Sequence, residues 1–181
     1  MLDSLSAPER DVAESLDPHA LLAAIVSTGA THVITVPDTH QKSLLALLED
    51  SPDLCLVTVC TEDEVMGVNL GLFMGGQRPF ILIQNSGLYA CLNTVRGLSL
   101  DARVPACMLI GEFSRNPRQL PGDHASRLVH LLEPTLDTWR IPTVRLDHPG
   151  DIPRIAKAMD RAWSERGPVA ILVGGTTKEL R

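Results

Sequence analysis

The sequence predicts a single α/β domain in which helices cover both faces of a mostly parallel sheet of about six strands. Short apolar segments recur along the chain about 25 residues apart, and segments with helical spacing of apolar residues separate them. The length of 181 residues is that of one ordinary globular domain. We expect residues 17–181 to form this three-layer α/β/α domain and residues 1–16 to form a polar N-terminal tail.

In the first third of the chain, two expected helices alternate with two expected strands. Asp17 is a suitable N-cap for the first helix, and Gly29 ends it. Pro37 ends the first strand, because proline cannot donate to a strand ladder. Leucines at helical spacing define the second helix. The expected elements are a helix over residues 18–28, a buried strand over 33–36, a helix over 41–49 and a second buried strand over 54–59.

The same alternation continues toward the C-terminus. A polar segment over residues 112–123, rich in Pro, Arg and Asn, interrupts it and is expected to form a long loop. Gly167 and Pro168 end the last helix. The expected elements are helices over residues 62–74, 88–98, 125–132 and 152–166, and strands over 79–83, 104–110, 142–146 and 169–173.

Composition excludes several classes of function. The formal net charge of −6 argues against a nucleic-acid-binding face, and the few aromatic residues (Phe 3, Trp 2, Tyr 1) argue against base stacking. No apolar run approaches the roughly 18 residues of a membrane-spanning helix. The N-terminus lacks the basic and then apolar order of a secretory signal. We therefore expect a cytoplasmic protein that binds neither nucleic acid nor membrane.

The four cysteines indicate a reducing compartment. They form no CxxC pair and show no metal-ligand spacing with histidine. We expect reduced, buried small side chains rather than a disulfide, a zinc site or a nucleophile, and we predict no metal ligands in this chain. The cysteines are Cys55, Cys60, Cys91 and Cys107.

Polar segments directly follow three of the expected strands, at the sheet edge where ligands of parallel α/β sheets bind. The segment over residues 84–87 could form a turn or present amide and hydroxyl groups to a heterocycle. The phosphate-binding patterns GxGxxG and GxxxxGK[ST] and the nucleophile pattern GxSxG are absent. The three segments are residues 37–40, 61–64 and 84–87, and the segment 112–124 is a fourth candidate.

Three carboxylates open the helix expected over residues 62–74. Acidic residues stabilise helix N-termini, so capping explains Glu62, Asp63 and Glu64 without any catalytic role. Alternatively, one of them faces the ligand, and periodicity does not decide which. Glycines recur every four residues on one face of this helix, which indicates close packing either on the sheet or against a partner chain. They are Gly67, Gly71 and Gly75.

A positive cluster follows the fourth expected strand on this acidic protein. It is formed by Arg115, Arg118, His124 and Arg127. Solvated surface charge and an anion site for a small acidic ligand both explain it.

Together these segments resemble the pyrimidine-binding (PYR) domain of thiamine-diphosphate enzymes, in particular the phosphonopyruvate and sulfopyruvate decarboxylase group. The VPDS-type turn of that group appears as Val36-Pro37-Asp38-Thr39. Its catalytic glutamate motif matches Thr61-Glu62 through Gly71, and its QNSG segment is intact at residues 84–87. The resemblance covers about residues 18 to 175.

The resemblance implies the thiamine-diphosphate-binding fold of PYR type and a role for individual residues. Glu62 is the implied catalytic residue, which hydrogen-bonds N1′ of the aminopyrimidine. The implied cofactor-binding residues are Pro37, Asp38, Thr39, Glu62, Gln84, Asn85, Ser86 and Gly87. For a sulfonated or phosphonated pyruvate, the implied substrate-binding residues are His40, Arg115, Arg118 and His124.

The GDG motif and Asn pair that hold Mg²⁺ and the diphosphate in the family are missing; Gly122-Asp123-His124 is the nearest match. The resemblance therefore implies an alpha-type subunit of a split decarboxylase that yields an aldehyde and CO₂. A beta-type subunit is expected to supply the diphosphate and Mg²⁺ site, and self-association is also expected. The alternatives are a carboligase subunit and a non-catalytic binding module on the same scaffold.

Overall fold

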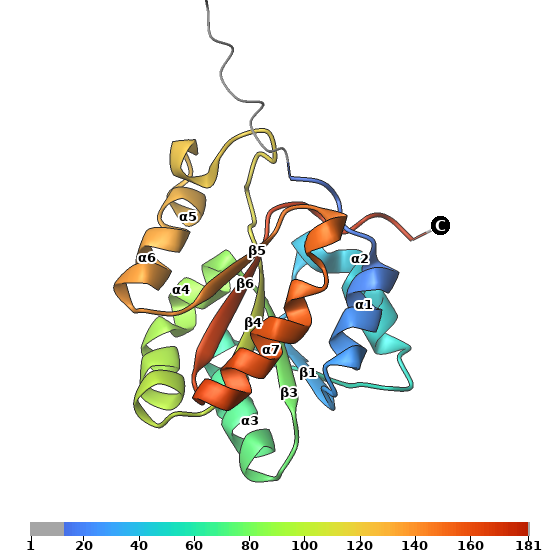
Figure 1. The fold of residues 1–181 in the computed structure, drawn as a ribbon, viewed down its shortest axis with the longest axis vertical. Coiled ribbons are helices and arrows are strands. Elements are labelled where there is room, and N and C mark those ends of the chain that lie inside the picture. Colours follow the sequence, from blue (N-terminus) through green and yellow to red (C-terminus); the bar gives the residue numbers. More distant parts are fainter. Residues whose placement is uncertain (1–12, 181) are drawn as a thin grey trace, which may run out of the picture.

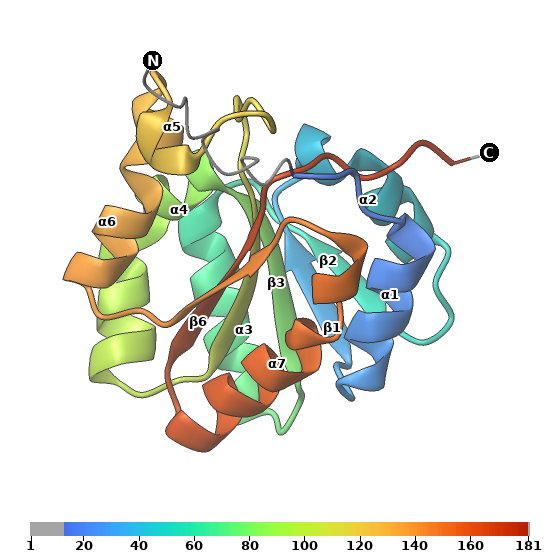
Figure 2. The same ribbon diagram turned by 45° about the horizontal axis from the view of Figure 1, so that its top comes forward.

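The computed structural model describes residues 13–180, and a six-stranded sheet forms its centre (Figures 1 and 2). The strand order is β2-β1-β3-β4-β6-β5, and every neighbouring pair is parallel. The predicted α/β class with about six strands is confirmed. The strands are β1 (His32–Thr35), β2 (Cys55–Thr58), β3 (Pro79–Gln84), β4 (Ala106–Gly111), β5 (Thr143–Leu146) and β6 (Pro168–Val173).

Helices cover both faces of the sheet (Figure 1). One face carries α1 (Pro18–Ser27), α2 (Lys42–Glu49) and α7 (Arg154–Glu165). The other carries α3 (Glu62–Met74), α4 (Asn85–Thr94), α5 (Arg127–His130) and α6 (Leu132–Thr138), and α4 continues as a π-helix, η2 (Val95–Asp101). Short 3₁₀ turns are η1 (Thr39–Gln41), η3 (Pro121–Asp123) and η4 (Pro149–Asp151).

Alternation along the strands divides the core into two apolar layers. In β3, Phe80 and Leu82 pack under α1, α2 and α7, whereas Ile81 and Ile83 pack under α3 and α4. Successive side chains of a strand point to opposite faces, so a strand that is buried on both faces must be apolar throughout. This explains why the central strands are continuous apolar runs in the sequence.

The ends of the first helix are the predicted ones. The Asp17 carboxylate accepts a hydrogen bond from the backbone N–H of His19 at 2.9 Å, which caps α1. Gly29 follows the helix with φ of 74°, a left-handed conformation that glycine adopts without a steric penalty.

Two expectations about burial are wrong. The strand expected over residues 54–59 is not buried, because β2 lies at the edge of the sheet and pairs only with β1. Cys55 and Cys60 are consequently exposed, whereas Cys91 and Cys107 are buried as predicted; all four are free thiols.

The helix expected over residues 125–132 is divided into α5 and α6 and extends to Thr138.

Part of the expected N-terminal tail belongs to the domain. Leu16 is fully buried and forms a parallel bridge with Thr177, and the backbone N–H of Glu14 donates to the carbonyl of Asp147 at 2.7 Å. The segment 13–16 therefore lies across the carboxyl ends of the strands. Residues 1–12 of the expected tail lie outside the described residues. No helix in the described part of the chain is long and apolar enough to cross a membrane.

Candidate functional site

The predicted polar segments meet at the carboxyl ends of the strands. After β1 the chain turns toward α2 on one face of the sheet, and after β3 it turns toward α4 on the other face. Neighbouring strands whose connections leave in opposite directions create a crevice at their carboxyl ends. The segments 37–40 and 84–87 flank this crevice, and Glu62 begins the helix that follows β2.

Hydrogen bonds distinguish the three carboxylates that open α3. Glu64 completes a capping box with Thr61, since its Oε2 accepts the backbone N–H groups of Cys60 and Thr61 at 2.8 and 3.2 Å. Asp63 accepts the hydroxyl of Thr94. Within residues 13–180, Glu62 has no hydrogen-bond or ion-pair partner. Capping therefore accounts for Glu64 and leaves the Glu62 carboxylate available for a ligand.

The Glu62 side chain lies against Gly87 in the first turn of α4. A methyl group on Gly87 would lie 2.5 Å from Cγ of Glu62 and would overlap its Oε1 atom. Two segments that were singled out separately in the sequence are thus in direct contact. Glycine at position 87 is what allows the Glu62 carboxylate to occupy this place.

We expect Gly87→Ala to displace the Glu62 carboxylate without unfolding the protein, and to lower at least about tenfold the turnover of the decarboxylase that the family resemblance implies. The clash is with a flexible side chain, and alanine in a helix is favoured over glycine by about 1 kcal/mol. Thermal unfolding and turnover, measured together, check this. Gly97→Ala is the matched control, because its methyl group meets nothing within 4 Å; equal turnover of the two variants would contradict the role given to Gly87.

The amide of Asn85 is used within the protein. Its Nδ2 donates to the carbonyls of Phe113 and Leu128, each at 3.1 Å, and its Oδ1 accepts the N–H of Ser86 at 2.9 Å. Asn85 is fully buried, so it anchors the long loop after β4 to α4. Of the segment 84–87, the half-buried Gln84 and Ser86 keep side chains that can meet a ligand.

The turn after β1 holds a buried carboxyl group. Asp38 is 2% exposed; its Oδ1 accepts the N–H of His40 at 2.8 Å, and its Oδ2 has no partner. Burial raises the pKa of Asp38 to about 6 and lowers the pKa of His40, whose Nε2 is also unpartnered. A methyl group on Gly111 would lie 2.5 Å from Asp38 Oδ2. Pro37, Asp38 and Thr39 line a pocket of about 410 Å³ beside α2.

The positive cluster predicted after the fourth strand is divided. Arg115 points into the protein, with 1% of its side chain exposed, and pairs with Glu112 and with Asp147 at 3.6 Å. Arg118 and Arg127 are exposed. The ring nitrogens of His124 lie 3.0 and 3.1 Å from the backbone nitrogens of Asn116 and Ser126, and a neutral imidazole accepts only one of these bonds. Because the side chain of Arg115 is buried in its ion pairs, it is not available for the expected contact with a substrate.

Sequence reasoning missed the ion-pair network into which Arg115 is drawn. Glu112 is fully buried after β4 and pairs with both Arg115 and Arg145, the latter at 2.7 Å. Arg145 also contacts Glu133 at 2.9 Å and Asp147 at 2.8 Å. Three carboxylates thus share two guanidinium groups. Burial outweighs the attraction of Arg145 and raises the pKa of Glu112 to about 7.

This raised pKa gives the fold a pH dependence. The native carboxyl of Glu112 holds its proton up to about pH 7, whereas in the unfolded chain it ionises near 4.5. Its contribution to stability is therefore full at low pH and is lost as the pH rises to about 7, at roughly 1 kcal/mol per pH unit. We expect Glu112→Gln to flatten the pH profile of the unfolding free energy by that slope. Glu165→Gln, an exposed carboxylate outside the network, should keep the wild-type slope; a wild-type slope in Glu112→Gln would contradict the assignment.

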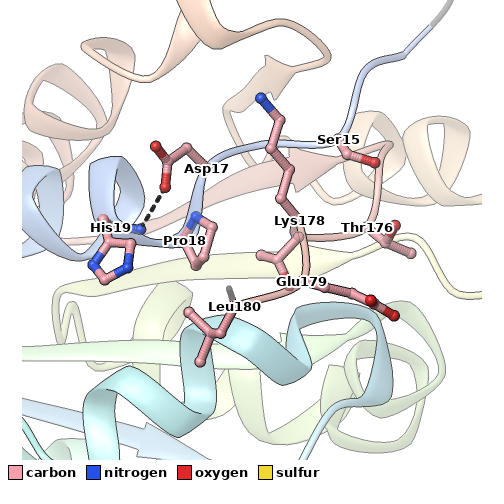
Figure 3. A pocket seen from close by; sticks show the side chains of 9 residues that line it. Ser15, Asp17, Pro18, His19, Thr176, Lys178, Glu179 and Leu180 are labelled. Atoms are coloured by element: carbon pink, nitrogen blue, oxygen red, sulfur yellow. Dashed lines mark hydrogen bonds between the residues drawn. The ribbon is translucent and has the colours of Figure 1, made fainter.

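A pocket of about 730 Å³ lies between the segment that leads into α1 and the C-terminal residues (Figure 3). Ser15, Asp17, Pro18 and His19 form one side, and Thr176, Lys178, Glu179 and Leu180 the other. The Asp17 carboxylate is turned back to cap α1, as the dashed bond to the backbone of His19 shows. None of the predicted site residues lines this pocket.

Comparison with solved structures defines the class of fold. The domain matches benzoylformate decarboxylase from Polynucleobacter necessarius with a TM-score of 0.64 at 15% identity, over 91% of this chain and 32% of that one. It matches 2-oxoglutarate:ferredoxin oxidoreductase from Magnetococcus marinus with a TM-score of 0.64 at 16% identity, over 90% of this chain and 29% of that one. The domain shares the fold of the matching parts of these two enzymes, which agrees with the predicted fold class. It spans about a third of each of these chains.

Sequence comparison narrows the resemblance. Sulfopyruvate decarboxylase subunit alpha of Methanocaldococcus jannaschii is 25% identical over 84% of this chain and 90% of its own length. The same subunit of Methanococcus maripaludis is 29% identical over 85% of this chain and 92% of its own length. Phosphonopyruvate decarboxylase of Streptomyces viridochromogenes is 32% identical over 62% of this chain and 27% of its own length. No family model matches the sequence. The chain is similar to the sulfopyruvate decarboxylase alpha subunits over most of its length, which confirms the predicted resemblance.

Proposed function

We propose that this chain is the alpha-type subunit of a split thiamine-diphosphate-dependent decarboxylase. It would act on a 3-substituted pyruvate such as sulfopyruvate or phosphonopyruvate and yield an aldehyde and CO₂. The observation that carries the proposal is the uncommitted Glu62 carboxylate lying on Gly87 of the QNSG segment. This arrangement occurs in a chain whose relatives are named as alpha subunits of sulfopyruvate decarboxylase.

The residues around Glu62 fit the aminopyrimidine half of thiamine diphosphate. That ring needs a carboxylate opposite a ring nitrogen and polar side chains beside it. Glu62 offers the carboxylate, Gly87 allows it to lie against α4, and Gln84 and Ser86 offer an amide and a hydroxyl. On the other side of the crevice, Pro37, Asp38 and Thr39 complete the proposed cofactor-binding set, with the unpartnered Oδ2 of Asp38 as an additional polar atom.

Glu62 would hold a proton between its carboxylate and N1′ of the pyrimidine. When bound, thiamine diphosphate supplies a carbon nucleophile for the ketone of a 2-oxo acid and an acceptor for the electrons released with CO₂. The contribution of this chain is to position one carboxylate and to move its proton. Because Gly87 and α4 confine the side chain, the carboxylate is held in place before the cofactor arrives.

The proposed substrate contacts are His40, Arg118 and His124. A sulfonate or phosphonate group requires partners that are cationic or donate hydrogen bonds. The Nε2 atom of His40 is buried and has no hydrogen-bond partner within the described residues. Arg118 is exposed on the loop after β4 and is free to approach a ligand at the strand ends. Arg115 is left out of this set because it belongs to the Glu112 network.

We further propose that a beta-type subunit completes the active site with the diphosphate-binding residues and Mg²⁺. The designation of the relatives as alpha subunits supports a partner. The glycine face of α3 supports a contact surface, since Gly67 and Gly71 are exposed and neither meets an atom within 4 Å of an added methyl group. Self-association through another surface is also proposed. Four free thiols suit a cytoplasmic location.

The test begins with an affinity pull-down of the full chain from the native extract, with mass spectrometry of the partner. A partner that carries GDG and a downstream Asn pair is expected. The complex is then assayed with thiamine diphosphate, Mg²⁺ and either sulfopyruvate or phosphonopyruvate, with and without an added aldehyde acceptor. CO₂ and free aldehyde support the proposal, whereas a coupled product indicates a carboligase. If the complex binds no thiamine diphosphate, the chain is a non-catalytic module.

A further inference from the structure

Another polar pocket lies at the amino ends of the strands, opposite the carboxyl ends where Glu62 lies. It has a volume of about 450 Å³ and is formed where η2, α6 and α7 end and where β5 and β6 begin. The junction of α7 and β6, whose residues contribute to this lining, lies at the lower left of Figure 1. Its lining includes four arginines, Arg103, Arg140, Arg161 and Arg166, but one carboxylate, Glu165.

The contacts of these arginines leave positive charge unbalanced. Arg161 pairs with the Glu165 carboxylate at 3.0 Å, and Arg103 donates to the Glu165 carbonyl at 2.8 Å. Arg166 is held over the ring of Phe73 at 5.4 Å. Within residues 13–180, the guanidinium group of Arg140 makes no hydrogen bond or ion pair. The fully buried Ser99, whose hydroxyl has no partner, lines the same pocket.

Three of these arginines stand in a backbone conformation that favours glycine. Arg103, Arg140 and Arg166 have φ of 58°, 55° and 51°, and among the described residues only Ser114 shares this property without being a glycine. Such strain persists where the surrounding structure imposes it and is common at binding sites. Three helical segments thus end in a left-handed arginine at one pocket.

Cations also stabilise the C-terminal ends of helices, which is a purely structural explanation for arginines here. A structural role does not require a left-handed arginine, since glycine is the usual residue at such a position. It also does not explain a guanidinium group without a partner beside three others on a protein of net charge −6. An oxyanion that accepts several guanidinium donors would account for both observations.

We propose that this pocket binds the tetrahedral oxyanion group, phosphate or sulfonate, of a small ligand. Arg140 and Arg103 are its principal donors, and Arg166 adds a further charge. The site lies at the amino ends of the strands, so it is separate from the proposed cofactor site at their carboxyl ends. Free phosphate and a sulfonated metabolite present the same head-group geometry but differ in charge.

The proposal is tested by titration calorimetry of the full chain with inorganic phosphate and with methanesulfonate. Chloride at equal ionic strength is the control titrant. Saturable binding of at least one oxyanion is expected. The oxyanion with the lower Kd shows whether the pocket takes a phosphate or a sulfonate group. Arg140→Gly should raise the apparent Kd about tenfold or more. Because glycine relieves the left-handed strain and Arg140 has no side-chain bonds, its melting temperature without ligand should equal or exceed that of the wild type.

Lys157→Ala removes an exposed cation of α7 outside the pocket and should leave the Kd unchanged. Arg118→Ala removes an exposed cation of the proposed substrate site and should also bind the oxyanion as the wild type does, which separates this pocket from the proposed function. The proposal is overturned if neither oxyanion saturates the protein, if Arg140→Gly retains the wild-type Kd, or if Lys157→Ala weakens binding equally. A drop in the melting temperature of Arg140→Gly with unchanged Kd would assign the arginine a structural role.

Discussion

Glu62→Gln is expected to lower turnover of the assembled enzyme by about 10²–10⁴-fold while leaving the fold intact. The amide has the shape of the carboxyl group, but it cannot take up or release a proton at N1′ of the pyrimidine. The loss should fall on kcat, because the substituted amide side chain can still contact the bound ring. The Glu62 carboxylate has no partner in the described part of the chain, so its replacement breaks no native hydrogen bond or ion pair.

The matched control is Asp63→Asn, which makes the same change of charge one residue further along α3. Its side chain can still accept the hydroxyl of Thr94, so turnover and melting temperature should stay close to those of the wild type. Circular dichroism and thermal unfolding establish that both variants are folded before kcat is compared. Wild-type turnover in Glu62→Gln, or an equal loss in Asp63→Asn, would remove Glu62 from the mechanism.

The fold class was predictable because the apolar patterns that define its strands and helices are local in the sequence. The central strands are buried on both faces, so each appears in the sequence as an unbroken apolar run, and β3 and β4 lie within two residues of their expected limits. The exposure of β2 was not predictable in this way. Its apolar run resembles the others, and its edge position depends on the strand order, which no local pattern encodes.

The candidate site was predictable only in part. The periodicity of the helix did not separate Glu62 from Asp63 and Glu64; the motif resemblance selected Glu62, and the hydrogen bonds of the other two agree with that selection. The prediction of Arg115 as a substrate contact rests on its place in a positive cluster and on the anionic substrate that the family resemblance implies. Its partner Asp147 and the competing Arg145 come from the end of β5, about 30 residues later in the chain, so the network that buries it is a consequence of tertiary structure.

Arg145→Met is expected to lower the free energy of unfolding by about 1–3 kcal/mol at about pH 8, because the Glu112 carboxyl group, whose pKa is about 7, can take up a proton when its partner is lost. Arg145 contacts Glu112, Glu133 and Asp147, and its loss leaves the fully buried Glu112 carboxylate with Arg115 as its one guanidinium partner. Methionine replaces the aliphatic part of the side chain, so the change reports chiefly on the lost charge. Urea unfolding of the wild type and the variant measures the difference.

Arg154→Met is the matched control. Arg154 is exposed, and its ion pair with Asp151 at 3.1 Å is on the surface, where such pairs contribute about 0–1 kcal/mol. The pH supplies a second criterion. Without Arg145 the pKa of Glu112 must rise further, so the destabilisation should shrink at about pH 5, where the carboxyl group is neutral in both proteins. Equal losses in the two variants, or a loss at Arg145 that does not change with pH, would show that packing of the side chain, rather than a stranded buried charge, is what Arg145 contributes.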